Sequence, residues 1–526
     1  MDRRHFLRTS SAATLGGFAV QGFASPLLQA LRNRSTEDRV LVIVQLTGGN
    51  DGLNTVIPLD QYGVLATKRP NVLIPQGTVL PLNGLGATGL HPSLGGMRNL
   101  WDDGKLAIVQ GVSYPDPNFS HFRATDIYET GADANQLLSS GWTGRYLNFE
   151  YPNYPAGYPN TEMPDPLAIR VGGAVGSGLQ YMGVSMGVAI NNTTDPLNLT
   201  GNIYLDPAAA DCSGGKLDFV RQVQRQTDLY GDVIEAAAVS GCNQSTLYPT
   251  GNAPGAELAQ ALKIVAQLIC GGLKTKIYWV SVGGFDTHAQ QVESGNTTQG
   301  THADLLQGLS DSIHAFQDDL SLLGLEDRVL GMTFSEFGRR IVDNASLGTD
   351  HGSAQPMFLF GTKVVPGMLG TNPDIPANAT YQTNLAMQYD FRSVYASVLK
   401  DWFCLEEDDI DAVLLNTYQP LALVDPGGCL GNSVHDINQG AGTDLLSAYP
   451  NPFTERTNLR YTSNGGRVLI QVFNEQGQLV QTLLNQPVPA GTYSVDLDLG
   501  DMTPGTYYAR MQNERAQQVR SLLKVR

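Results

Sequence analysis

Short polar motifs flank the most apolar runs of this 526-residue chain, and their side chains are of the types that bind metal ions. TGGNDG follows the run RVLVIVQL, GGFDTH follows KIYWVSV, EFGRR follows RVLGMTFS, and GTDHG precedes MFLFG. The candidate ligands in these motifs are Asp51, Asp286, His288, Glu336, Asp350 and His351. Gathered at one place, the carboxylates would repel one another unless cations neutralised them. The mixed oxygen and nitrogen set suits Zn, Mn or Mg and is large enough for one or two ions.

Each motif also has a structural interpretation when it is taken alone. Asp51 lies in a Gly-rich segment, where an Asp can form a turn by bonding its own backbone. GTDHG is also turn-like, and His288 could be an ordinary loop histidine. Glu336 could cap a helix that begins at Phe337. The metal site is therefore predicted from the motifs jointly.

Ser120 is the candidate nucleophile, in the motif FSHFRATDIYETG after the run KLAIVQGV. The helix period begins at His121, which places Ser120 at a helix N-cap, where free N–H groups and the helix dipole favour phosphate or sulfate. A neighbouring metal would lower the pKa of its hydroxyl. The alternative is a purely structural N-cap. Further candidates are His121 for catalysis and Asn50, Arg123 and Arg339 for binding the anionic substrate.

The apolar runs next to these motifs are nearly continuous, as strands covered on both faces are. Segments with helix period lie between them: PSLGGMRNLWDDG, AELAQALKIVAQLIC, HADLLQGLSDSIHAFQDDLSLLG and FRSVYASVLKDWF. This alternation predicts an α/β domain over residues 39–429, with a mainly parallel sheet and helices on both faces. Ligands of such sheets bind beyond the carboxyl ends of the strands. Residues 130–255, rich in Pro, Gly, Tyr and Asn, fit neither period and are expected to be an insertion.

Both ends of the chain carry segments of another kind. The N-terminus, MDRRHFLRTSSAATLGGFAVQGFAS, has paired arginines before a short apolar stretch and resembles a twin-arginine export signal over residues 1–24. The alternative is an amphipathic first helix. After a linker, residues 430–445, the segment 446–526 alternates apolar and polar residues between turns, which predicts a small β-sandwich.

The C-terminal motifs AYPNPF, VFNEQGQLV, AGTYSVDL and PGTYYARM resemble the sorting domain of the bacterial type IX secretion pathway. The resemblance implies a delivery tag that an outer-membrane translocon recognises. With the N-terminal signal, it implies export through the periplasm to the cell surface or the medium. The alternative is an ordinary sandwich that binds carbohydrate.

Net charge, hydropathy and cysteine spacing argue against several classes of partner and of site. The formal net charge of −17 disfavours nucleic acid and anionic membrane surfaces. No segment has the roughly 20 apolar residues that a transmembrane helix requires. The five cysteines include no CxxC pair, which argues against a thiolate metal site. Proximity in sequence suggests the disulfides Cys212–Cys242 and Cys404–Cys429, with Cys270 as a buried free thiol.

Six motifs in order resemble a family of exported bacterial proteins of unknown function in the alkaline phosphatase and sulfatase superfamily. They are QLTGGNDGLNTVIPL, LHPSLGGM, DPNFSHFRATDIYETG, GGFDTH, TFSEFGR and GTDHGSAQPMFLFG, and they cover almost all of residues 39–425. The superfamily implies a parallel-sheet core and often a two-metal site that hydrolyses phosphate or sulfate esters. By position, the resemblance makes Ser120 the nucleophile and Asp51, Asp286, His288 and His351 ligands.

We therefore expect a secreted, metal-dependent hydrolase of anionic esters. One alternative is a surface-displayed binding or structural protein that keeps the fold and a metal. Another is metal-dependent phosphoryl transfer or isomerisation on a sugar phosphate.

Overall fold

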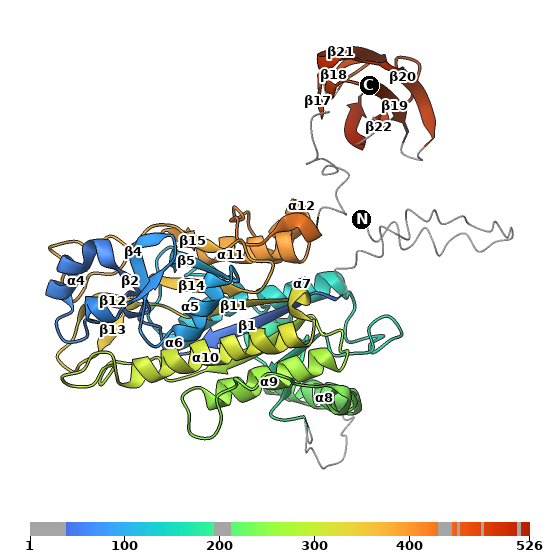
Figure 1. The fold of residues 1–526 in the computed structure, drawn as a ribbon. Helices are drawn as coiled ribbons and strands as arrows, with labels where there is room; N and C mark the ends of the chain where they lie inside the picture. Colours follow the sequence, from blue (N-terminus) through green and yellow to red (C-terminus); the bar gives the residue numbers. More distant parts are fainter. Residues whose placement is uncertain are drawn as a thin grey trace. The chain divides into compact units, whose positions relative to one another are not determined.

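The computed structural model describes residues 38–193, 212–429, 444–449, 453–474, 478–512 and 517–525 (Figure 1). The chain divides into two compact units, one spanning Thr36–Gly427 and the other containing Gly428–Arg526. The twin-arginine signal predicted for residues 1–24 lies outside the described residues, and so does the predicted linker up to residue 443.

A nine-stranded sheet forms the centre of the larger unit (Figure 1). Eight strands follow the order β15 (Gly367–Leu369), β5 (Leu106–Ser113), β14 (Gln355–Phe360), β11 (Val329–Ser335), β1 (Val40–Leu46), β10 (Ile277–Val282), β6 (Ala168–Val171) and β9 (Val188–Ile190), and β16 (Tyr389–Asp390) pairs with β5. All pairs are parallel except those of β14, which runs antiparallel to β11 and to β5. The predicted α/β fold with a mainly parallel sheet is confirmed, and all five apolar runs are strands of this sheet.

Helices cover both faces of the sheet. One hydrophobic core contains side chains of α5 (Gly95–Asp102), α8 (Cys212–Ser240), α9 (Ala256–Cys270) and α10 (Thr301–Leu322). The other contains side chains of α6 (His121–Thr130), α7 (Trp142–Glu150), α11 (Phe391–Ser397) and α12 (Glu407–Leu414). The last turn of FRSVYASVLKDWF continues α11 as a π-helix, Val398–Trp402.

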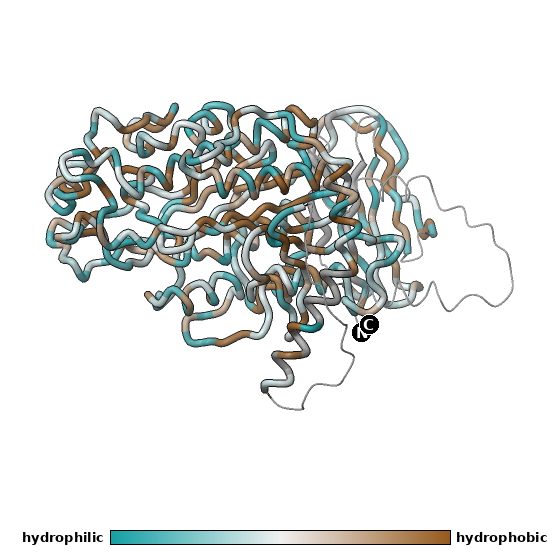
Figure 2. The backbone as a smooth tube through the Cα atoms, turned by 90° about the horizontal axis from the view of Figure 1, so that it is seen from below, coloured by the Kyte–Doolittle hydropathy of each residue, from teal (hydrophilic) through white to brown (hydrophobic). Residues whose placement is uncertain are grey.

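Strand β1 shows why the apolar runs are continuous. Val40, Val42 and Val44 belong to the first core, whereas Leu41 and Ile43 belong to the second. Successive side chains of a strand point to opposite faces, so a strand with a core on each side needs apolar residues at every position. Figure 2 shows such brown, hydrophobic stretches running through the middle of the α/β unit.

The segment expected to be an insertion, residues 130–255, contributes to the sheet itself. It supplies β6 and β9, which pair in parallel with β10 and with each other. It also supplies α7 and α8, and α8 contributes Tyr230, Ile234, Ala237 and Ala238 to the first core. Strands of four and three residues are too short to show a period in sequence.

Smaller elements surround the sheet at its carboxyl edge. They are α3 (Gly52–Thr55), β2 (Val56–Pro58), α4 (Tyr62–Lys68), β3 (Leu80–Leu82), β4 (Leu85–Leu90), and the hairpin of β12 (Arg339–Asp343) with β13 (Thr349–His351). The β7 (Gln180–Tyr181) and β8 (Val184–Ser185) pair lies within the 130–255 segment.

The predicted disulfide Cys212–Cys242 is wrong, because Cys242 pairs with Cys270. Cys212 begins α8 and Ser240 ends it, so at 1.5 Å per residue the helix separates them by about 42 Å. Cys270 ends α9, which packs against α8, and its Cα lies 5.9 Å from that of Cys242. It is therefore not a free thiol. Cys404 and Cys429 are also disulfide-bonded.

The C-terminal unit consists of two antiparallel sheets around its own hydrophobic core, so the predicted small β domain is confirmed. One sheet contains β17 (Asp444–Tyr449), β18 (Arg456–Asn464) and β21 (Ala490–Asp498). The other contains β20 (Leu479–Pro487), β19 (Arg467–Phe473), β22 (Gly505–Gln512) and β23 (Gln517–Lys524).

Candidate metal centre

The carboxyl edge of the main sheet gathers most of the predicted site residues. The parallel strands β1, β5, β10 and β11 all end at this edge. Strand β14 runs the opposite way, so its amino end lies here, directly after Asp350 and His351 in the β12–β13 hairpin. Because β14 is reversed, the motif GTDHG, which precedes it, lies at the same edge as the motifs that follow the parallel strands.

Four side chains converge on one point of this edge. The ligand atoms of His121, Asp286 and His351 all lie within 4.8 Å of one another. The carboxylate of Asp286 lies 3.0 Å from Nε2 of His351 and 3.3 Å from Nε2 of His121. Nε2 of His288 lies 3.2 Å from the same carboxylate and 2.9 Å from Nε2 of His351.

Nδ1 of each of the three histidines lies within hydrogen-bond distance of an oxygen acceptor. Nδ1 of His351 lies 2.8 Å from the carbonyl oxygen of Phe119, which can only accept, so Nδ1 carries the hydrogen. Nδ1 of His288 faces a carboxylate oxygen of Asp350 at 3.1 Å. In the neutral rings, Nε2 then presents a lone pair.

Nδ1 of the third histidine, His121, lies 2.8 Å from Oε1 of Glu336. With Nδ1 of each ring bonded to an acceptor, three imidazole Nε2 atoms thus face one carboxylate. A second proton on His351 is disfavoured, because burial lowers the pKa of its imidazole. A divalent cation fits this arrangement, since metal-binding histidines typically donate their other N–H to a carboxylate or a carbonyl.

Glu336 lies behind His121. The residue is fully buried, and its Oε1 also accepts a 2.8 Å hydrogen bond from the backbone N–H of Gly48. Ser335 Oγ lies 3.2 Å from Oε2. The predicted ligand Glu336 therefore holds His121 in orientation, and its oxygens do not join the converging group.

Asp51 lies apart from the converging group and is almost completely buried. Its Oδ2 accepts hydrogen bonds from Arg69 Nη1 at 2.7 Å and from Gln291 Nε2 at 2.6 Å. Burial raises the pKa of Asp51, but the charge and hydrogen bond of Arg69 outweigh it and the net shift is downward. The charge that sequence reasoning assigned to a metal is neutralised by a guanidinium.

Arg339 is the second buried arginine of this edge. It donates to the carbonyl oxygens of Gly48, Gly49, Phe285 and Thr349, and Nη2 lies 2.8 Å from Oδ1 of Asp286. Burial raises the pKa of Asp286, but the hydrogen bond and the charge of Arg339 outweigh it, and the pKa falls to about 2. Asp286 is thus ionised and ready to bind a cation.

The glycines of TGGNDG permit the close approach that these bonds need. Gly48 has φ +126°, and a Cβ on it would overlap the backbone of Phe285 and Asp286. Gly49 has φ +86°, and a Cβ there would overlap the ring of Phe337. Only glycine fits both the space and the backbone conformation.

Ser120 is the N-cap of α6, as predicted, but its side chain makes no capping hydrogen bond. The residue is exposed and lies between Phe119, whose carbonyl holds His351, and His121. Its hydroxyl is therefore available beside the converging group.

The three predicted anion contacts face inward. Asn50 is buried, with Oδ1 3.0 Å from Thr55 Oγ1. Arg123 pairs with Asp126 and donates to carbonyl oxygens of the 133–136 loop. Arg339 is fully engaged, as described above.

Sequence reasoning missed Arg69, Gln291, Arg340 and Asn344. Asn344 Nδ2 donates to the His288 carbonyl at 2.8 Å and lies 3.2 Å from Asp350 Oδ1. Arg340 could have been found from the sequence, because it is the last residue of the motif SEFGRR. Arg69 stands in no motif, and only the fold brings it to Asp51.

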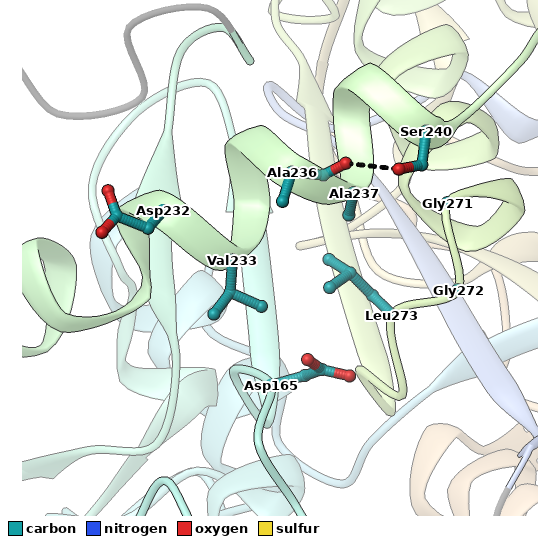
Figure 3. Close-up of a pocket in the computed structure, with 9 residues that line it drawn as sticks. All are labelled: Asp165, Asp232, Val233, Ala236, Ala237, Ser240, Gly271, Gly272 and Leu273. Atoms are coloured by element: carbon teal, nitrogen blue, oxygen red, sulfur yellow. Dashed lines mark hydrogen bonds between the residues drawn. The ribbon is translucent and has the colours of Figure 1, made fainter.

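A cavity of about 360 Å³ lies at the opposite edge of the sheet, before β6 and β10 (Figure 3). Two of its polar groups are engaged within the protein. Ser240 Oγ donates to the Ala236 carbonyl, and Asp165 Oδ2 accepts from the backbone N–H of Lys274. It is separate from the converging group.

Two protein families match the chain. Residues 87–414, more than half of the chain, match the family described as a protein of unknown function, DUF1501. The chain belongs to the DUF1501 family. Residues 447–525 match the secretion system C-terminal sorting domain. This DUF1501 protein is therefore secreted or displayed at the cell surface, with an export machinery as a partner. No described helix is long and apolar enough to cross a membrane.

Solved structures similar to this DUF1501 protein include three of bacterial origin. One, from work on glycosaminoglycan metabolism by Bacteroides thetaiotaomicron, is 9% identical over 85% of this chain and 89% of that chain, with a TM-score of 0.33. A sulfatase from Pseudoalteromonas sp. is 10% identical over 91% and 88%, with a TM-score of 0.31. A phosphonate monoester hydrolase from Silicibacter pomeroyi is 10% identical over 92% and 89%, with a TM-score of 0.30. The comparison with curated proteins found no match.

Proposed function

We propose that this DUF1501 protein is a metal-dependent hydrolase of phosphate or sulfate esters, with an ion held by Asp286, His121, His288 and His351. The observation that carries the proposal is the arrangement of three histidines. Each has Nδ1 bonded to an acceptor and Nε2 within 3.3 Å of the same carboxylate. His121, predicted as a catalytic residue, becomes a ligand in this proposal.

Charge balance supports one ion rather than two. Arg69 neutralises Asp51, and Arg339 neutralises part of the charge of Asp286. A second divalent cation in this region would face two buried guanidinium groups. Three imidazoles and one carboxylate favour Zn or Mn over Mg, which prefers oxygen ligands.

The residues around the ion divide the work of ester hydrolysis. The ion, when bound, supplies a Lewis acid that lowers the pKa of a nearby hydroxyl. Ser120 Oγ forms a bond to the phosphorus or sulfur atom while the bond to the ester oxygen breaks, and the alcohol leaves with a proton. Water then cleaves the seryl ester, which releases the anion and restores the hydroxyl. Glu336, Asp350 and Phe119 keep the histidines in place.

Export completes the proposal. The twin-arginine translocon would carry the chain across the inner membrane, and the type IX translocon would carry it across the outer membrane. The ester substrate is then extracytoplasmic, which disfavours phosphoryl transfer or isomerisation on a sugar phosphate.

Metal analysis of the purified protein combined with turnover assays tests the function. We expect about one equivalent of Zn or Mn per chain and activity on aryl phosphates, phosphodiesters or aryl sulfates. Ser120→Ala should remove turnover and keep the metal. Ser139→Ala is the matched control, because Ser139 is an exposed serine whose hydroxyl contacts only Met182 among the described residues.

Each result of this experiment decides between the candidate functions. A protein that is metal-free and inert on the whole panel contradicts the proposal. Stoichiometric metal without turnover favours the alternative, a surface-displayed binding protein that keeps the ion.

A further inference from the structure

We propose that Arg340 binds the anionic group of the substrate. The inference rests on the proposed hydrolase function and deepens it, because it names the residue that selects a negatively charged ester. Of the three residues predicted for this task from the sequence, Asn50 is buried, and Arg123 and Arg339 pair with carboxylates of the protein. Arg340 is half-buried at the same edge of the sheet.

Arg340 contacts the backbone of the proposed ligand His351 and lies near Phe119, the residue before the candidate nucleophile. Its Nε donates to the carbonyl oxygen of His351 at 2.9 Å. Its guanidinium lies 5.8 Å from the ring centroid of Phe119. Phe119 in turn accepts the Nδ1 hydrogen of His351 and precedes Ser120 in the chain. These contacts place the guanidinium on the Ser120 side of the converging histidines.

The guanidinium keeps donors that the protein does not use. Nη1 donates to the Tyr381 carbonyl at 3.0 Å and to Gln382 Oε1 at 2.9 Å. Among the described residues, Nη2 of Arg340 has no hydrogen-bond partner. An arginine carries five N–H groups in a planar fork that matches the oxygens of phosphate and sulfate.

The other arginines near this edge offer no such donors. The side chain of Arg69 is fully buried, and its nitrogens donate to Asp51, Asn54 and two backbone carbonyls. Arg339 is equally buried and engaged. The contrast makes Arg340 the arginine of this region, within the described chain, that can meet a ligand from solvent.

Local charge explains why such a residue is needed. The side chains of Asp286 and Asp350 are 46% and 50% exposed. An approaching anion meets these two carboxylates, whose two negative charges one divalent ion can balance without leaving an excess of positive charge. The partly exposed guanidinium of Arg340, near the ring of Phe119, can supply the missing attraction.

Binding of inorganic phosphate and sulfate to the metal-loaded full-length protein tests the inference without requiring turnover. Arg340→Gln should weaken the binding of the better ligand about 10- to 100-fold, because a charge-assisted hydrogen bond is lost. KM for an anionic substrate should rise by a similar factor, with unchanged metal content. Arg340→Lys keeps the charge and should recover part of the affinity.

Arg328→Gln is the matched control. Arg328 is a partly exposed arginine before β11, at the opposite edge of the sheet, so the same charge is removed far from the site. If Arg340→Gln and Arg328→Gln both bind like the wild type, the inference about Arg340 is wrong while the hydrolase proposal stands. If the wild type itself neither binds these anions nor turns over esters, the proposed function fails. If Arg340→Gln loses metal, Arg340 acts on His351 and is not the anion-binding residue.

Discussion

Asp51 and Asp286 follow neighbouring strands at the same edge of the sheet, yet their surroundings are opposite. Asp51 is 1% exposed and is held by Arg69 and Gln291. The side chain of Asp286 is 46% exposed, and three imidazole nitrogens face it. A buried carboxylate needs a permanent partner, because desolvation without one is costly. An open carboxylate among imidazole lone pairs can instead be neutralised by an ion that enters from solvent.

The largest expected effect is on the metal. Asp286→Ala removes the carboxylate that all three histidines face, so the metal content should fall from about one ion per chain to almost none. Elemental analysis after gel filtration measures it. Asp102→Ala serves as the control, because Asp102 is a partly exposed carboxylate in an ion pair with Arg98. An Asp286→Ala protein that keeps its ion would falsify the proposed ligand set.

The next largest effect is on the stability of the fold. Asp51→Ala leaves Arg69 buried without its carboxylate, which should lower the free energy of unfolding by about 3–5 kcal/mol. Urea denaturation of the metal-free protein measures the loss. Asp286→Ala, the same substitution at the open site, should cost less, because Arg339 keeps its backbone carbonyls. Equal losses at the two positions would contradict the comparison.

Metal removal should have a smaller effect on stability. An ion present at 100 times its Kd stabilises the folded state by about 2.7 kcal/mol. EDTA should therefore lower the urea midpoint of the wild type, and added Zn should restore it. Asp286→Ala should show no EDTA effect. Asp51→Ala should show the full effect from a lower starting point, and an Asp51→Ala protein insensitive to EDTA would place Asp51 among the ligands.

The smallest effect concerns the residues that orient the histidines. Asp350→Ala removes the acceptor of the His288 Nδ1 hydrogen and should weaken metal binding about 10- to 100-fold. Competition with a metal-chelating dye measures the affinity. Asp343→Ala, on the same β12–β13 hairpin, should leave it unchanged, since Asp343 accepts from the backbone of Asn71. A similar loss in both variants would point to the hairpin's stability instead.

Much of this fold could be predicted from the sequence, for a physical reason. Strands buried on both faces are apolar at nearly every position, so β1, β5, β10, β11 and β14 stand out in the chain. The motifs at their ends had to meet at one edge wherever the strands were parallel. The apolar pattern of a buried strand does not depend on its direction, however, so the sequence could not predict that β14 is antiparallel to its neighbours.

The partners of the site residues were less predictable. Asp51 reads as a possible ligand because nothing in TGGNDG shows the guanidinium that reaches it from Arg69, 18 residues away. In the same way, no local sequence pattern shows that Cys242 forms its disulfide with Cys270. Such pairs depend on how helices and loops pack over the sheet, which local patterns do not encode.

The β12–β13 hairpin joins two functions in one piece of backbone. Arg339 pairs in register with His351, and Arg340 follows Arg339, so the proposed ligand and the proposed anion-binding residue share the same two strands. Any displacement of the hairpin moves both of them. In the proposed site the ion and the substrate anion also carry opposite charges, so each should raise the affinity of the other, and by the same factor. Phosphate or sulfate should then slow the loss of metal to a chelator.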